Sequence, residues 1–101
     1  MRMLMIVEYP HEPFNTLVRK GTAGELIGKI LAGIKPEAAY FTELHGRRTA
    51  VLVVNLENAS QIPALAEPWF LNFNADCRIH PVMSSEDLQR SGLPDLGKNW
   101  G

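Results

Sequence analysis

The sequence predicts one small α+β domain over residues 1–101, in the order strand, helix, strand, strand, helix, strand, followed by a short C-terminal helix. Apolar runs of strand length alternate with two segments of helical periodicity. Glycine and proline separate these runs, as is typical of turns. The composition, with 46% hydrophobic and 21% charged residues, is that of an ordinary globular domain.

The first half of the chain supplies one strand and one main helix. Residues 3–9 are almost all apolar and stop at Pro10, which is typical of a strand covered on both faces. A short helical phase then breaks at Gly21, and residues 22–25 have the form of a capping box. Apolar residues follow at spacings of three and four, so we expect a helix over residues 23–34.

The second half begins with a hairpin and a second helix. Residues 38–45 and 49–56 have the pattern of two strands, joined by a turn in which Gly46 can adopt a positive φ. Asn58 or Ser60 can cap the helix that follows. Its apolar stripe predicts a buried face made of Ile62, Leu65, Ala66, Trp69, Phe70 and Phe73.

The end of the chain predicts an edge strand and a short helix. Residues 76–82 alternate between polar and apolar, and Pro81 restricts this strand to a sheet edge or a strand end. Residues 84–90 begin with hydroxyl and acidic side chains and are followed by Gly92. Such a segment is typical of a short helix.

The two inner strands of this arrangement are apolar on both faces. The element order is that of the ferredoxin-like fold, in which two helices cover one face of a four-stranded antiparallel sheet. The second apolar face must be hidden by something else, because apolar surface costs about 25 cal/mol per Å² when it faces water. We expect a homodimer through this open face. The alternative cover is the C-terminal segment, folded back over the sheet.

The element order, with a sheet that is apolar on both faces, resembles the dimeric α+β barrel superfamily, in which two ferredoxin-like subunits pack sheet to sheet around a cavity. Four segments carry a narrower resemblance: Gly21–Glu25, Lys35–Glu43, Ile62–Phe70 and Pro81–Leu88. They are similar to a small bacterial family within that superfamily, which has no assigned reaction. The resemblance implies a fold and a homodimer but no particular chemistry.

The charge and residue content argue against several classes of partner. Ten basic and eleven acidic residues leave a net charge of −1, and the third strand has no aromatic residue to stack on a base, so we expect no nucleic acid. No segment approaches the roughly 20 apolar residues of a membrane span. The lone Cys77, expected to be a small buried apolar group, favours a reducing cytoplasm. Histidine, cysteine and acidic residues lack compact ligand spacing, so we expect neither a metal nor a cofactor.

Polar residues on the open face are the candidates for a ligand site. Alternation places Arg78 and His80 on this face, where Glu8 and Glu43 can join them if the strand register allows. Tyr40 lies on the opposite face from Glu43, so at most one of the two can take part. These groups can hold an acidic or carbonyl compound, with His80 transferring protons near neutral pH. The alternative is that they only guard a sheet edge.

Two functions remain open from the sequence. The chain is either an enzyme or binding protein for a small organic molecule, held in the cavity of a dimeric barrel, or a non-catalytic regulatory or protein-interaction domain. The residues do not decide whether a reaction is catalysed.

Overall fold

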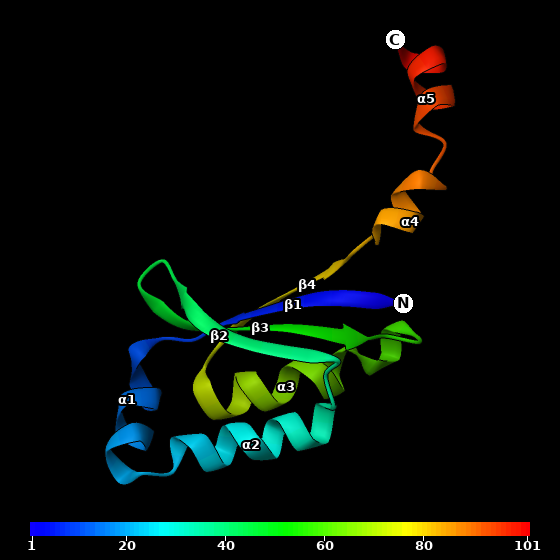
Figure 1. Cartoon of the computed structure of the whole chain (residues 1–101). Coiled ribbons are helices and arrows are strands. Elements are labelled where there is room, and N and C mark those ends of the chain that lie inside the picture. Colours follow the sequence, from blue (N-terminus) through cyan, green and yellow to red (C-terminus); the bar gives the residue numbers. More distant parts are fainter.

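The protein, described for residues 1–101 by a computed structural model, has an α+β fold with a four-stranded antiparallel sheet and five α-helices (Figure 1). This confirms the predicted class. The strands are β1 (Arg2–Glu8), β2 (Ala38–Leu44), β3 (Arg47–Asn55) and β4 (Asp76–Pro81). The helices are α1 (His11–Lys20), α2 (Ala23–Ile34), α3 (Ile62–Phe73), α4 (Ser85–Gln89) and α5 (Leu93–Trp100), and a 3₁₀ turn, η1 (Ala59–Gln61), precedes α3.

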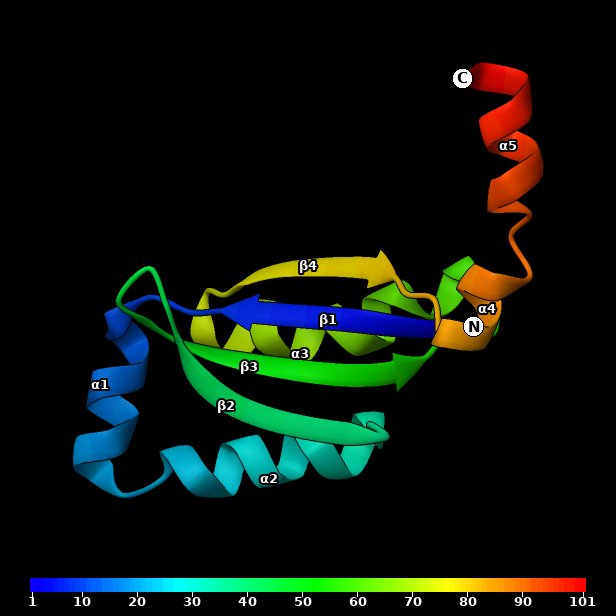
Figure 2. The same cartoon turned by 45° about the horizontal axis from the view of Figure 1, so that its top comes forward.

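The sheet has the order β2-β3-β1-β4, so that the two most apolar strands, β1 and β3, are central. The proline-containing β4 lies at an edge, as its sequence predicts. Helices α2 and α3 lie on the same side of the sheet (Figures 1 and 2). On this side Met5, Val7 and Leu52 are fully buried. We call the other side the open face.

An aromatic cluster joins the sheet to the helices. The rings of Tyr9 and Phe14 lie 4.8 Å apart, and Phe73 lies 5.4 Å from the first and 5.2 Å from the second. The predicted stripe of α3 is buried at Leu65, Ala66, Trp69 and Phe73. Ile62 and Phe70 are instead partly exposed, because one begins the helix and the other lies at the margin of the stripe.

The hairpin turn is shorter than the sequence suggested. Leu44 pairs with Arg47, which leaves only His45 and Gly46 in the turn. Both have positive φ, 56° and 74°. Two such residues form a type I′ turn, whose twist matches that of the adjoining strands. Arg47 and Arg48 therefore belong to β3 rather than to the loop.

The helix ends follow the sequence prediction in part. The side chain of Asn58 accepts a hydrogen bond from the Ser60 amide and caps η1, whereas α3 itself follows Gln61 without a side-chain cap. Thr22 makes no capping bond, because its ψ of −7° is not that of an extended cap residue. Its hydroxyl donates instead to the Leu17 carbonyl.

Residues 82–101, which we call the C-terminal arm, extend away from the sheet (Figures 1 and 2). The arm contains α4, near the single short helix expected, and also α5, which the sequence prediction missed. The Cα radius of gyration is 17.0 Å, against about 13 Å for a compact chain of this length. The arm therefore does not fold back over the open face, and this alternative cover is ruled out within one chain.

None of the helices combines the length and the apolar character that a membrane crossing requires.

Replacement of Phe73 by alanine should lower the free energy of unfolding by about 3–5 kcal/mol, because it empties a fully buried site in the aromatic cluster. Leu71→Ala is the matched control on the same helix. Leu71 is 79% exposed, so its loss should change stability by no more than about 0.5 kcal/mol. Urea unfolding followed by circular dichroism measures both, and equal losses would contradict this packing.

Candidate functional site

The open face has an aliphatic centre and a polar edge. Residues that pair directly across antiparallel strands point to the same face, so the register assigns each side chain to a row. Leu4, Ile6, Val51 and Val53 occupy the two central strands and are only partly buried. From β2 to β4 the rows are Ala38, Val53, Leu4 and His80; then Tyr40, Val51, Ile6 and Arg78; then Thr42, Thr49, Glu8 and Asp76.

Glu8, at the end of the central strand β1, lies at the centre of a polar cluster with Arg78 and His45. Its side chain is 12% exposed, although a carboxylate usually lies in water. Arg78 Nη2 donates to Glu8 Oε2 over 3.2 Å, and His45 Nδ1 lies 2.9 Å from Glu8 Oε1. A carboxylate only accepts hydrogen bonds, so Nδ1 of His45 carries the proton in this contact. In neutral His45, Nε2 is then the free acceptor.

The predicted site residues come together only in part. Arg78 and His80 lie on the open face, opposite Ile6 and Leu4, and Glu8 contacts Arg78. Glu43 does not join them: it pairs with Arg48 on the helix side, and its carboxylate accepts a hydrogen bond of 2.9 Å from the Gly46 amide.

Tyr40 occupies the open face in its place and is 68% exposed. The two-residue turn sets this choice, since a shift of register by one residue would exchange the faces of Tyr40 and Glu43.

His45 is the site residue that sequence reasoning missed. In the sequence it is one of several histidines without metal-ligand spacing. Its turn conformation, with φ of 56°, brings its ring to a strand that is distant in sequence. A two-residue hairpin turn at His45-Gly46 is the signal that points to it.

Cys77 lies on the other face of β4, against α3. Its Sγ is 4.0 Å from the carbonyl oxygen of Ala66. Burial, with smaller contributions from Asp76 and Glu67, raises the pKa of the thiol to about 11. The thiolate form that a nucleophile needs is therefore disfavoured, as the sequence analysis expected.

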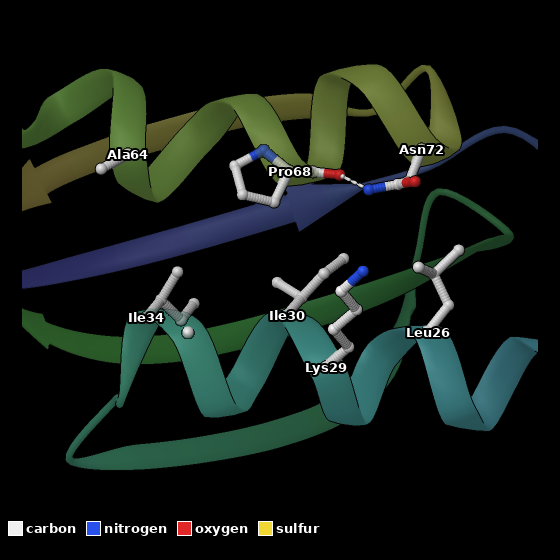
Figure 3. Close-up of a pocket in the computed structure, with 8 residues that line it drawn as sticks. Leu26, Lys29, Ile30, Ile34, Ala64, Pro68 and Asn72 are labelled. Carbon is white, nitrogen blue, oxygen red and sulfur yellow. Dashed lines mark hydrogen bonds between the residues drawn. The ribbon is translucent and has the colours of Figure 1, made fainter.

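The three hollows of the single chain do not lie on the open face. Each of the three is lined in part by residues of α2. The groove between α2 and α3 encloses about 290 Å³ and is bordered by Leu26, Ile30, Ile34, Ala64, Pro68 and Asn72 (Figure 3). Lys29 is its only charged residue. Asn72 Nδ2 is already engaged, because it donates to the Pro68 carbonyl over 2.7 Å. No three histidine, cysteine or acidic side chains gather as a metal site.

A double-mutant cycle with Glu8→Gln and Arg78→Gln should give a coupling energy of about 0.5–1 kcal/mol, because Glu8 is largely shielded from water. The Arg2–Glu37 pair is a matched control with a similar 3.2 Å contact between two half-exposed side chains. Its coupling should be near zero. Urea unfolding of the variants measures both, and equal couplings would show that the burial of Glu8 has no energetic effect.

Alkylation of Cys77 by iodoacetamide should be about 100-fold slower at pH 8 in the folded protein than in concentrated urea. The raised pKa keeps the folded thiol protonated below about pH 11, so the folded-state rate should continue to rise through pH 10. The unfolded thiol has an ordinary pKa, and its rate should level off near pH 9. Mass spectrometry of timed samples measures the rate, and equal rates in both states would contradict the half-buried position of Cys77 against α3.

The chain matches no family model and no curated protein.

Proposed function

We propose that two copies pack through their open faces as a ferredoxin-like dimeric α+β barrel, and that the space between the sheets binds a small organic molecule with a carboxylate or carbonyl group. The order β2-β3-β1-β4 supports this arrangement, with α2 and α3 connecting the strands on one side of the sheet. The dimer is isologous, so each sheet presents the same rows of residues to the other.

One observation carries the proposal. The open face has an aliphatic centre that nothing in the chain covers, bordered by Tyr40 on β2 and by Arg78 and His80 on β4. Packed sheets lie about 10 Å apart, and their side chains fill the layer between them. At the margins of this layer the aliphatic packing ends, and exposed polar side chains there leave room for a ligand. Binding sites in proteins commonly combine an apolar wall with a few polar groups of this kind.

Arg78, His45 and Tyr40 each have a distinct role in the proposed site. Arg78 binds the carboxylate or carbonyl oxygen, because a guanidinium offers two parallel donors. Its contact with Glu8 holds it in place. His45, oriented by the same carboxylate, offers Nε2 as a proton acceptor, and Tyr40 forms an aromatic wall. These groups serve a binding protein and equally an enzyme that moves a proton. The reducing cytoplasm is the compartment we expect, since Cys77 is the only cysteine.

A second candidate is a non-catalytic regulatory or interaction domain. The C-terminal arm favours it, because Leu93 and Trp100 are exposed there. Exposed apolar groups that lie together commonly mark a protein contact.

Arg78→Ala should weaken the binding of benzoate, used as a probe aromatic carboxylate, by at least about tenfold, because a charge-assisted hydrogen bond is lost. Arg19→Ala is the control: Arg19 is an exposed arginine on α1, bonded to Glu12, and benzoate binding should not change. Isothermal titration calorimetry measures the affinities. Native mass spectrometry of protein from its own host reports the oligomeric state and any retained compound.

Equal losses in both arginine variants would show that benzoate binds through general charge and would contradict the site. A protein that remains monomeric at all concentrations would contradict the barrel itself.

A further inference from the structure

The C-terminal arm carries an apolar stripe that is largely exposed in the single chain. Leu93, Leu96 and Trp100 are spaced at i, i+3 and i+7 in α5, which places them on one face of the helix. All three are exposed, and Trp100 is 86% exposed. A tryptophan is rarely left in water in this way.

The helices of the arm are too short to persist alone. Helix α4 has 5 residues and α5 has 8. Isolated helices of fewer than about 12 residues are marginal in water, and most helices are stabilised by packing their apolar face. The last backbone hydrogen bond to the sheet runs from the Val82 amide to the Arg2 carbonyl. The hydrogen bonds of residues 84–101 lie within the arm. A packing surface must therefore come from outside the chain.

The direction of the arm indicates what supplies that surface. From the end of β4 the arm rises on the open-face side of the sheet, away from α2 and α3 (Figures 1 and 2). A second sheet packed on the open face would lie about 10 Å above the first. Helix α5 alone is about 12 Å long, so the arm would pass beyond this layer and along the flank of a second copy.

We propose that the arm is exchanged between two copies, so that α5 of each copy packs by Leu93, Leu96 and Trp100 on the other and closes the ligand site beside His80. The arm begins directly after Pro81, next to His80, so it leaves the sheet at that end of the site. Symmetry makes the exchange reciprocal, and each arm replaces a water-exposed stripe by a buried one. This inference rests on the dimer proposed above and adds that each site is incomplete without the second copy.

The first test places the photoreactive residue benzoylphenylalanine at position 100 in a mixture of ¹⁴N- and ¹⁵N-labelled chains. Irradiation should give cross-links that join the two isotopes, detected by mass spectrometry of digested peptides. Cross-links only within one isotope would show that the arm packs on its own chain and would overturn the exchange. An absence of cross-links would also overturn it, because position 100 would then face water.

The second test compares two double variants of α5. Leu96→Ala with Trp100→Ala removes the stripe and should raise the dimer dissociation constant at least about tenfold, because apolar surface is lost twice in a symmetric dimer. Asp95→Ala with Lys98→Ala changes the opposite side of the helix and should leave the constant within about twofold. The substituted residues lie in α5, outside the sheet and its core, so both variants should still fold.

Sedimentation of both variants separates the two proposals. If the full chain never dimerises, both the proposed barrel and the arm exchange are contradicted. A dimer that forms normally and is equally stable in both variants overturns the exchange and leaves the barrel intact.

Discussion

The central strands β1 and β3 are apolar on both faces, while the chain provides helices for only one face. Met5 and Leu52 are fully buried against α2 and α3, whereas their neighbours Ile6 and Val51 remain half-buried on the open face. Sheets with both faces apolar are usually covered on both sides. An antiparallel sheet with one uncovered apolar face carries a cost of about 25 cal/mol for each Å² in contact with water. The dimer that we propose would cover this face, and the proposed arm exchange depends on that dimer.

The largely shielded carboxylate of Glu8 positions neighbouring side chains more than it stabilises the fold. At about 3 Å the Coulomb attraction to Arg78 is several kcal/mol even at an effective dielectric constant near 20. Desolvation of the carboxylate offsets most of this gain. What remains is geometric: Glu8 links β4 to the β2–β3 turn, since Arg78 and His45 each bond one of its oxygens. Two side chains that are far apart in sequence are thereby held at one edge of the sheet.

The sequence predicts the individual helices and strands well, but it predicts poorly how they pair and how they are placed relative to one another. Periodicity alone placed α2, α3 and the alternation of β4, so that Arg78 and His80 share a face as expected. The choice between Tyr40 and Glu43 depends on how many residues the hairpin turn contains, and a change of one residue reverses it. His45 was missed for the same reason. The stripe of α5 is too short to be distinguished from a loop, and no local pattern encodes the direction of the arm.

The groove between α2 and α3 and the polar side chains of the open face lie on opposite sides of the sheet. The α2–α3 groove has volume and apolar walls, but Lys29 is its one charge and Asn72 is already bonded. The open face has a guanidinium, two imidazoles and a phenol, and in a single chain none of the hollows lies there. A ligand needs both a shape and convergent polar groups. The groove lacks the second, whereas a second sheet above the open face would supply the first. Arg78 and His80, on the open face of β4, are therefore the stronger basis for a function.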